Sequence, residues 1–381
     1  MKSARVLHVI HSFSWGGLEL YTSELIQQLQ TTGLQQQVLC FGNSRIAKEL
    51  EAAGVSVIGT PGSKISKLAE AQIIRACIKQ YRITHLHSHT RLDMWACCLA
   101  RWFDPNIKHI YNLYMNALPK RDFIHKALFK RVDALCSSSE TIINDARKNF
   151  PIDQYKLRLI RYGRQTELFN HNRVERARIR EKYNVHNDQM VIGTLCRIDD
   201  GKGVRELAES LDHLSDAELS KIQLWILGDP TAKGKAADGS PIYEEKSLEL
   251  FTWLHGRCNS VRLKNHLKHI PFQKDYVSYL DAMDVFTLAS YNETYSLSVL
   301  DAMMMEKPVI GTNAGGTPEQ TGHNERGILA EPRSATSLAQ CIRYYLQNPE
   351  VAQQHGHQAK DWAKSNHNWP NTLKQFLKLY S

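Results

Sequence analysis

The feature of this sequence that most constrains its fold is a regular alternation of two kinds of segment. Short apolar runs rich in β-branched residues are followed by longer stretches in which apolar residues recur every three to four positions. Such a pattern is typical of buried strands joined by amphipathic helices, and consecutive parallel strands need a crossover connection of this kind. The sequence therefore predicts an α/β protein built on parallel sheets.

The alternation runs through the chain in two series. We expect strands of the first series at residues 5–11, 37–41, 55–60, 85–90, 107–113, 133–138 and 156–163, and strands of the second at 190–197, 222–228, 266–272, 284–290 and 307–312. With 381 residues the chain is long enough for two domains. The predicted fold class is two Rossmann-like doubly wound domains facing a central cleft, with ligands at the carboxyl ends of the strands.

Composition places the domain boundaries. The polar, charge-dense segment 170–186 is expected to be the joint between the series, and the Gly- and Pro-containing segment 229–246 an exposed loop. We predict an N-terminal domain at residues 1–168, a C-terminal domain at 169–360 and a C-terminal helix at 361–381 that packs back on the first domain.

Charge is divided unevenly between the two parts. Residues 1–182 hold 28 Lys and Arg against 15 Asp and Glu, a net +13, whereas the rest of the chain has a net −4. An anionic partner is therefore expected for the first domain only, and a membrane surface, a phosphorylated substrate or a nucleic acid would each qualify. The basic helix predicted at 121–131 is either a core helix with solvated cations or, with Phe129, a contact for anionic lipid.

Overall composition excludes other classes of protein. At 42 % hydrophobic and 23 % charged residues, the sequence is too apolar for a disordered chain and too polar for a membrane bundle. The eight cysteines lie mostly in apolar runs without zinc-ligand spacing, which is typical of buried thiols in a reducing compartment. No signal peptide and no apolar stretch of about 18 residues is present, so we expect a cytoplasmic protein.

Two glycine-containing turns follow predicted strands and precede helices. Gly16 and Gly17 follow the first strand, where glycine lets backbone N–H groups approach a ligand and the helix N-terminus favours an anion. In the second series, Arg197 and Lys202 flank a turn and could converge on a diphosphate. A tight turn, or a solvated one neutralised by Asp199 and Asp200, explains these patterns equally well.

The segment after the strand at 284–290 carries two carboxylates. Glu293 ends that strand and Asp301 lies about one turn into the next helix, so both can face one cleft and each can accept sugar hydroxyls. Backbone N–H groups of Thr294, Tyr295, Ser296 and Leu297 lie between them. Asp301 is equally consistent with a carboxylate that is stabilised by the helix dipole.

His85, His87 and His89 alternate along one strand and are expected to face one side of the sheet. We do not expect them to bind zinc, since no carboxylate or cysteine joins them at ligand spacing. A histidine at the end of this strand is better suited to a hydrogen bond with a sugar.

Taken in order, these motifs resemble those of GT-B glycosyltransferases of family 4, over almost the whole chain. The resemblance rests on the glycine-rich first loop, His-x-His, Arg-x4-Lys-Gly, the acid pair eight residues apart and Ala-Gly-Gly-x-Pro-Glu at 314–319. It implies retaining transfer of a hexose-type sugar from a UDP- or GDP-linked donor to a hydroxyl of a glycan or glycolipid, without a metal or other cofactor. Bacterial surface polysaccharide or lipopolysaccharide synthesis is the implied setting.

The resemblance also implies roles for individual residues. Arg197 and Lys202 would bind the donor diphosphate, Glu293 would lie beside the hexose, and Asp301 would hold the ribose. Residues Thr294 to Leu297 would offer backbone N–H groups, Gly16 and Gly17 would close over the diphosphate, and His87 or His89 would lie on the acceptor side. The chain departs from the family pattern in having Asp301 for a second Glu, Tyr114 for a histidine and Glu306 for a glycine.

Two alternatives remain open at this point. A nucleotide-sugar hydrolase or epimerase would keep the fold and change the reaction. A non-catalytic anion-binding protein would use the cationic first domain, although a nucleic-acid binder would need an array of stacking aromatic side chains that the sequence does not show.

Overall fold

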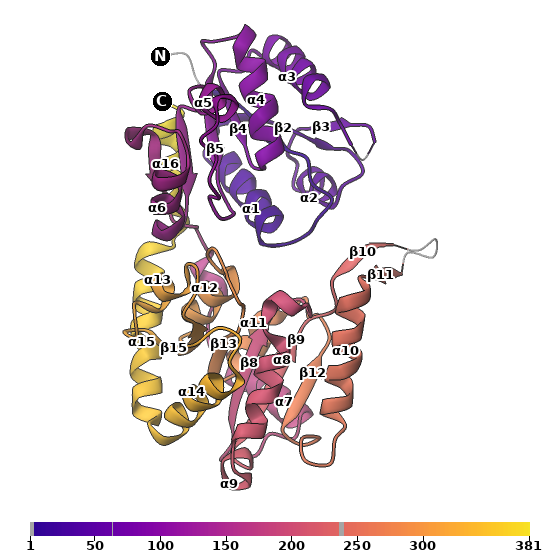
Figure 1. Cartoon of the computed structure of the whole chain (residues 1–381), viewed down its shortest axis with the longest axis vertical. Coiled ribbons are helices and arrows are strands. Elements are labelled where there is room, and N and C mark those ends of the chain that lie inside the picture. The colour runs from indigo at the N-terminus through magenta and orange to yellow at the C-terminus, as the bar shows by residue number, and fades with distance from the viewer. Residues whose placement is uncertain (1–3, 63, 236–239) are drawn as a thin grey trace. The chain divides into compact units, whose positions relative to one another are not determined.

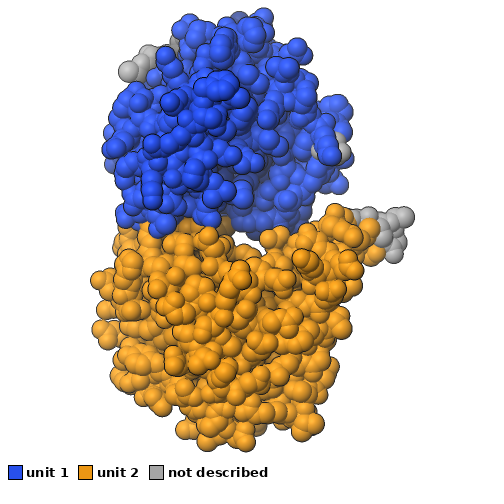
Figure 2. Space-filling model, in the orientation of Figure 1, with its two compact units in different colours: residues 1–164, 367–381 blue, residues 165–366 orange. Residues whose placement is uncertain are grey.

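The computed structural model describes residues 4–62, 64–235 and 240–381, which form two compact units. Unit 1 comprises residues up to 164 together with 367–381, and unit 2 comprises 165–366, as the two colours of Figure 2 show. The boundaries predicted from composition were at 168/169 and 360/361. Each unit is built on its own parallel sheet, as expected.

Unit 1 contains a seven-stranded parallel sheet in the order β3-β2-β1-β4-β5-β6-β7 among its described residues (Figure 1). Its strands are β1 Arg5–Ile10, β2 Gln35–Phe41, β3 Val57–Thr60, β4 His85–Ser88, β5 Lys108–Asn112, β6 Ala134–Ser137 and β7 Leu157–Leu159. Its helices are α1 Gly17–Thr31, α2 Arg45–Ala52, α3 Lys67–Tyr81, α4 Arg91–Phe103, α5 Phe123–Phe129, α6 Glu140–Asn149 and α16 Trp369–Leu379.

Unit 2 contains a six-stranded parallel sheet in the order β12-β9-β8-β13-β14-β15, again among its described residues. Its strands are β8 Met190–Leu195, β9 Ile222–Leu227, β12 Leu267–Ile270, β13 Val285–Leu288, β14 Val309–Thr312 and β15 Gly327–Ala330, with a separate hairpin of β10 Ala232–Lys235 and β11 Pro241–Tyr243. Its helices are α7 Arg173–Lys182, α8 Val204–Glu209, α9 Asp216–Leu219, α10 Glu245–Cys258, α11 Tyr276–Ala282, α12 Leu297–Met304, α13 Thr317–Thr321, α14 Ala335–Gln347 and α15 Pro349–Asn366.

The strands of unit 2 bury both of their faces. Along β9, Leu224 and Ile226 belong to one apolar cluster, whereas Trp225 and Leu227 belong to the other. Because successive side chains of a strand point to opposite faces, the two clusters lie on opposite sides of the sheet. This explains why the strands read as continuous apolar runs, and it confirms the predicted Rossmann-like architecture.

The C-terminal helix α16 belongs to unit 1. Trp369 stacks on Tyr21 of α1, with ring centroids 5.7 Å apart and an interplanar angle of 7°. The hydroxyl of Tyr380, just after the helix, lies 2.7 Å from Nδ1 of His87 on β4. These contacts attach the end of the chain to the sheet of the first unit.

Three sequence-based expectations were wrong in detail. Most of the predicted joint at 170–186 forms α7 of unit 2, because Arg176 and Arg180 of this charge-dense helix both pair with Asp284. The predicted loop 229–246 holds the β10–β11 hairpin and the start of α10, and residues 236–239 lie outside the described part of it. Phe129 is only 2 % exposed because its ring packs against Phe150, so it is not available to lipid.

Within the described residues, no helix is both long enough and apolar enough to cross a membrane.

Candidate active site

Three loops meet where the neighbouring strands β8, β13 and β14 of unit 2 end. The loop after β8 carries Lys202, and the loop after β13 carries Glu293. The ammonium group of Lys202 donates a hydrogen bond to Oε1 of Glu293, with an N···O distance of 2.6 Å. Two residues that are 91 positions apart, and that were predicted to share a site, are therefore in direct contact.

The Lys202–Glu293 pair lies partly below the surface, with side chains 22 % and 23 % exposed. Burial opposes the charge on Lys202, but the nearby carboxylate of Glu293 outweighs that effect and raises the pKa of Lys202 above its ordinary value. Lys202 is therefore a cation at neutral pH. Burial raises the pKa of the adjacent Cys196 thiol to about 11, which keeps that group neutral.

Arg197 lies on the same loop as Lys202 but points more to solvent. Its side chain is 54 % exposed, and its guanidinium is 3.7 Å from the carboxylate of Asp199. The Thr231 hydroxyl donates a hydrogen bond to the same carboxylate, at Oδ2 of Asp199. Arg197 thus retains a largely exposed cation beside the loop that holds Lys202.

Glycine allows the three loops to pack closely. Gly203 has φ +65°, and a Cβ atom there would lie 2.1 Å from the carbonyl oxygen of Ala289. Gly315 has φ +58°, and its Cβ would lie 2.1 Å from the carbonyl oxygen of Glu293. The next N–H, of Gly316, donates a 2.8 Å hydrogen bond to that same carbonyl. The Gly315–Gly316 pair therefore supports the backbone of Glu293.

The segment between the two predicted acids leads into α12. Tyr295 and Ser296 are buried, and the Ser296 hydroxyl caps the helix by accepting the Val299 N–H. Gln320 of α13 binds both backbone groups of Ser296, because its Oε1 accepts the N–H and its Nε2 donates to the carbonyl, each at 2.9 Å. The Ser296 N–H is thus engaged within the protein. Gln320 was not singled out in the sequence, where nothing marks it.

Asp301 lies in the second turn of α12 and is 4 % exposed. Its Oδ2 accepts a 3.0 Å hydrogen bond from the hydroxyl of Tyr276, at the start of α11. Tyr276 is a second residue that sequence reasoning missed, and its distance of 25 residues from Asp301 gives no local signal. The roles assigned to Asp301 and to Thr294, Tyr295 and Leu297 stay predictions, whereas the prediction for Ser296 was wrong because its N–H is already donated to Gln320.

In unit 1, Gly16 and Gly17 lie at the start of α1, after the loop that follows β1, as predicted. The Gly16 N–H donates a 2.9 Å hydrogen bond to Oε2 of Glu19, and the Ser12 hydroxyl donates to Oε1 of the same carboxylate at 2.6 Å. Glu19 is buried, so this loop is held by a carboxylate of the chain itself. The predicted contact of these glycines with a donor stays a prediction.

His87 and His89 lie in the interior of unit 1, where both are about 1 % exposed or less. They are grouped with His8 of the neighbouring strand β1, whose Nδ1 lies 3.1 Å from Nε2 of His89. Burial lowers the pKa of His87 to about 4 and that of His89 well below its ordinary value. Both rings are neutral at pH 7, and their predicted place on the acceptor side stays a prediction.

Two groups of potential metal ligands occur among the described residues, namely His8 with His87 and His89, and His11 with Glu70 and Asp93. In the second group the imidazole of His11 lies 3.2 Å from Asp93 and 3.3 Å from Glu70. Burial opposes protonation of His11, but hydrogen bonds to these carboxylates outweigh it and raise its pKa to about 9. The group is thus a buried cluster of one imidazole and two carboxylates in direct contact.

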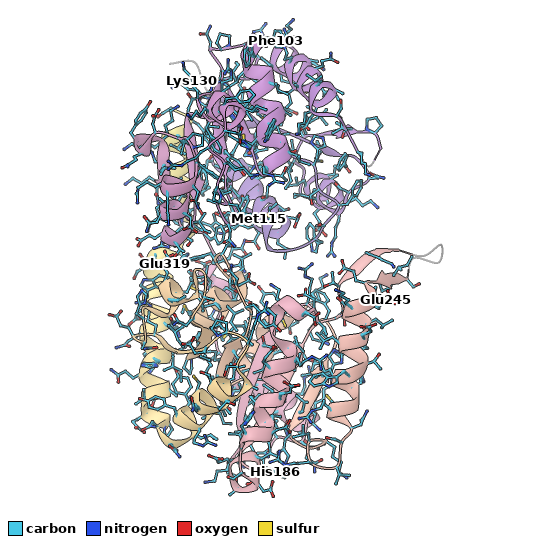
Figure 3. All side chains as sticks on the ribbon, in the orientation of Figure 1. Phe103, Met115, Lys130, His186, Glu245 and Glu319 are labelled. Atoms are coloured by element: carbon cyan, nitrogen blue, oxygen red, sulfur yellow. The ribbon has the colours of Figure 1, made fainter. Side chains whose placement is uncertain are left out.

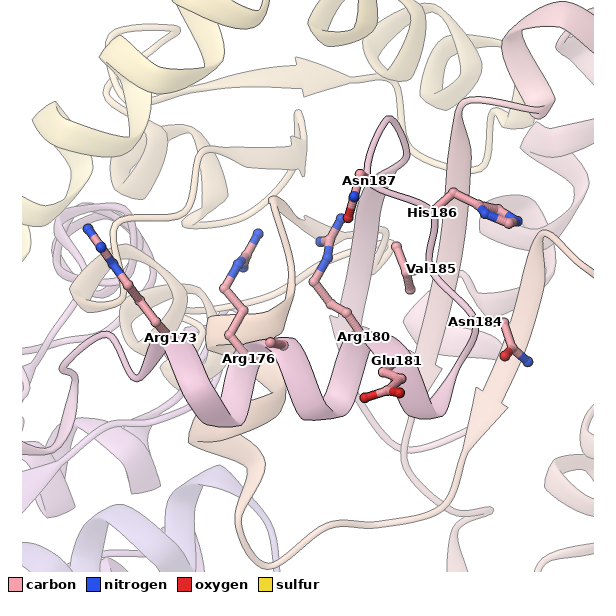
Figure 4. A pocket seen from close by; sticks show the side chains of 9 residues that line it. Arg173, Arg176, Arg180, Glu181, Asn184, Val185, His186 and Asn187 are labelled. Carbon is pink, nitrogen blue, oxygen red and sulfur yellow. The ribbon is translucent and has the colours of Figure 1, made fainter.

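A separate hollow lies beside α7 in unit 2 (Figure 4). It is lined by α7 and the turn before β8, including Arg173, Arg176, Arg180 and Asn187. This places it near the edge at which β8 begins, away from the loops that carry Lys202 and Glu293. Arg176 and Arg180 are already paired with Asp284. We therefore assign the candidate site to the loops and not to this hollow.

Sequence comparison identifies two family profiles that together cover most of the chain. The profile described as Glycosyltransferase Family 4 matches residues 15–168, and the profile described as Glycosyl transferases group 1 matches residues 175–362. The second match includes Arg197, Lys202, Glu293 and Asp301.

Individual proteins show the same relationship at low identity. D-inositol 3-phosphate glycosyltransferase of Corynebacterium urealyticum is 22 % identical over 96 % of this chain and 90 % of its own length. The capsular polysaccharide biosynthesis glycosyltransferase CapM of Staphylococcus aureus is 22 % identical over 61 % of this chain and 58 % of its own length. The crystal structure of Anabaena HepE in complex with UDP and glucose has a TM-score of 0.80 at 17 % identity, over 98 % of both chains.

Proposed function

Since the chain is a glycosyltransferase of the GT4 type with the GT-B fold, we propose that it moves a hexose-type sugar, with retention of configuration, from a UDP- or GDP-linked donor to a hydroxyl of a glycan or glycolipid. The observation that carries this proposal is the Lys202–Glu293 pair, held at 2.6 Å where the strands of unit 2 end. The proposed setting is bacterial surface polysaccharide or lipopolysaccharide synthesis in the cytoplasm. The capsule-synthesis relative CapM supports this setting, and the UDP complex of HepE supports a nucleotide-linked donor.

The chemistry follows from what the pair can do as the glycosidic bond breaks. Negative charge then develops on the leaving diphosphate, and a fixed ammonium stabilises that charge more than it stabilises the bound donor. Lys202 supplies this cation, and the exposed guanidinium of Arg197 adds a forked donor for phosphate oxygens. In this mechanism the lysine and arginine neutralise the diphosphate, so no metal or other cofactor is required.

Glu293 has two tasks in this proposal. Its Oε1 accepts from Lys202, which fixes the ammonium, and its second oxygen would accept a hydroxyl of the donor hexose. Asp301 would hold the ribose, with Tyr276 fixing its carboxylate. Retention requires the acceptor hydroxyl to attack from the face that the diphosphate leaves. The bond from the sugar to the diphosphate oxygen breaks as the bond to the acceptor oxygen forms, and the hydroxyl proton goes to the leaving diphosphate.

A ligand screen followed by product analysis tests the proposal. A nucleotide that binds only the folded protein at about 100 times its Kd stabilises it by about 2.7 kcal/mol, which raises Tm by about 5–11 °C in a domain of this size. We expect such a shift with UDP or GDP and with one of their hexose conjugates. Proton NMR of the product should show the anomeric configuration of the donor. Donor hydrolysis alone, or epimerisation without an acceptor, would contradict transfer.

We also propose that unit 1 contacts an anionic membrane through the surface around α5, defined by Leu118, Lys120, Arg121, Phe123 and Ile124. Phe123 is 80 % exposed, and Leu118 and Ile124 are also exposed. Apolar side chains among cations match the headgroup region of an anionic bilayer.

Vesicle binding tests the α5 surface. We expect the protein to sediment with vesicles containing 30 % phosphatidylglycerol and not with pure phosphatidylcholine. Each cation near the anionic surface should contribute about 1 kcal/mol to the binding free energy. Phe123→Ser together with Ile124→Ser should reduce binding at least tenfold. Val261→Ser, which changes an apolar side chain of unit 2 that is 90 % exposed, serves as the control. Equal binding by the double variant would contradict this contact.

A further inference from the structure

An exposed aromatic ring stands on the loop that follows β1 in unit 1. Phe13 is 45 % exposed, and its ring lies parallel to that of Phe41, with centroids 4.6 Å apart and an interplanar angle of 8°. Phe41 is the last residue of β2 and is 6 % exposed. One face of Phe13 is therefore covered by Phe41, and the exposure belongs to the outer face and edges of the ring.

This pair of rings rests on a buried base. The ring of Phe41 meets the imidazole of His11 in a T-shaped contact, with centroids 4.8 Å apart. The His11 ring is held by the carboxylates of Asp93 and Glu70 and by the Thr60 hydroxyl, which lies 3.1 Å from Nε2. Both carboxylate side chains are 3 % exposed or less. The support below Phe13 is thus fixed by charged groups in the interior.

The loop is also fixed on both sides of Phe13. Before it, the backbone N–H of His11 donates to Asp93, and the Ser12 hydroxyl donates to Glu19. After it, the Ser14 N–H donates to Ser12 and the Gly16 N–H donates to Glu19. Because the loop is already ordered, a ligand that covers Phe13 would lose little binding free energy in ordering it.

We propose that the Phe13–Phe41 stack is a subsite for a pyranose ring of the acceptor, an inference that rests on the proposed function and assigns a carbohydrate to this edge of unit 1. A pyranose presents a face of C–H groups with hydroxyls around its rim, which suits one flat aromatic ring among polar neighbours. Here Ser12 and Ser14 flank Phe13 in the chain. Two residues further on, the guanidinium of Arg45, whose side chain is 56 % exposed, covers the ring of Trp15. A lipid chain would need a continuous apolar surface instead.

Saturation-transfer NMR with methyl glycosides tests the subsite. The probes are the methyl α-glycosides of glucose, galactose and mannose and the methyl β-glycoside of N-acetylglucosamine, with the full chain and no donor present. We expect saturation of the ring C–H protons of at least one probe by the unmodified protein. That signal should fall about five- to tenfold in Phe13→Ala, in the range of a lost aromatic contact, and be retained in Phe13→Tyr.

Phe103→Ala is the matched control. Phe103 is 65 % exposed and lies under the Arg75 guanidinium, but it ends α4 near the edge where β5 begins (Figure 3). Its replacement should leave the signal unchanged. The Tm of Phe13→Ala, alone and with UDP or GDP, should equal that of the unmodified protein, so that a lost signal reports the subsite.

The proposal is overturned if no probe is saturated, if Phe13→Ala retains the signal, or if Phe13→Ala reduces binding of the nucleotide and of no sugar. The last result would assign a nucleobase to this ring. Failure of the proposed function is a separate result, since it would show as the absence of any nucleotide-dependent Tm shift in the unmodified protein.

Discussion

Replacing Lys202 by methionine is expected to lower kcat/KM for sugar transfer by about 10²–10³-fold, the usual effect of removing one group that stabilises transition-state charge. Methionine keeps an unbranched apolar stem and removes the ammonium. The same change leaves Glu293 without the partner that lies 2.6 Å away, on a carboxylate that is only 23 % exposed. Initial rates of nucleoside diphosphate release, measured with saturating acceptor, give the comparison.

Two further variants separate the charge from the fold. Lys221→Met removes an exposed lysine that directly precedes β9, at the opposite edge of the same sheet, and should keep the rate within twofold. Lys202→Arg restores a cation in a different shape and should recover part of the activity. A loss below threefold in Lys202→Met, with unchanged Tm, would contradict the role given to this residue.

The pair itself can be tested by a double-variant cycle. If Glu293 acts mainly by holding Lys202, then adding Glu293→Gln to Lys202→Met should cost little beyond the single change, because residues in direct contact are not additive. If Glu293 also binds the hexose, the double variant should lose a further tenfold or more. We expect the second outcome, since the carboxylate has an oxygen beyond the one that accepts from Lys202.

The sequence was sufficient for the features that depend on local pattern. Runs such as residues 222–228 and 284–290 became β9 and β13, because a strand covered on both faces is apolar throughout. The contact of Lys202 with Glu293 was also within reach. Each residue lies in the loop that follows its own parallel strand, and such strands end at one edge of a sheet.

The features that were missed depend on packing between distant segments. The three strand histidines were expected to face one side of the sheet, but the sequence did not show that His8 joins His87 and His89, whereas His85 lies beside Thr84 and Tyr380. Which histidine joins them is decided by the β1–β4 register, in which His8 lies opposite His87. Gln320 and Phe13 gave no signal either, since neither belongs to a recognisable motif and both act through neighbours from other elements.

Unit 1 is expected to lose stability steeply below pH 6.5. His8, His87, His89 and His109 are all buried in its sheet, and burial lowers the pKa of each. A group whose pKa is lower in the folded state binds its proton first in the unfolded chain. Its contribution is therefore complete above the unfolded value of about 6.5 and is lost as the pH falls toward the folded value.

The loss of unfolding free energy follows from the pKa values of two of these histidines. The pKa is about 4 for His87 and about 3 for His109. Between pH 7.5 and pH 5 each then removes about 2 kcal/mol, at 1.36 kcal/mol per pKa unit. His8 and His89 act in the same direction, whereas His11 of the same unit, whose pKa is raised to about 9, opposes them by about 1.4 kcal/mol over this range. Against a usual stability of about 5–15 kcal/mol, this loss can unfold the unit near pH 5.

Urea unfolding at pH 7.5, 6.5, 5.5 and 5.0 checks this expectation, with pulse-labelling hydrogen exchange at one fixed pH to follow the two units separately. Peptides from β5 should show a urea midpoint that falls with pH more steeply than that of peptides from β9. His269 and His355 of unit 2 also have pKa values lowered by burial, but these two are less deeply buried. The carboxylates of unit 2 with lowered pKa values, such as Asp284, lose their contribution only below about pH 4.

The variant His109→Asn tests whether the buried histidines cause the fall of the unfolding free energy with pH. His109 lies on β5 with Nε2 2.9 Å from the Ser88 hydroxyl, and asparagine can keep a polar contact there without taking up a proton. We expect this variant to be less stable at pH 7.5 but to lose about 1.4 kcal/mol less per pH unit between pH 6.5 and 5. His186→Asn, at an exposed histidine of unit 2, should leave the slope unchanged. A β5 midpoint independent of pH would show that these rings are already solvated or charged in the folded protein.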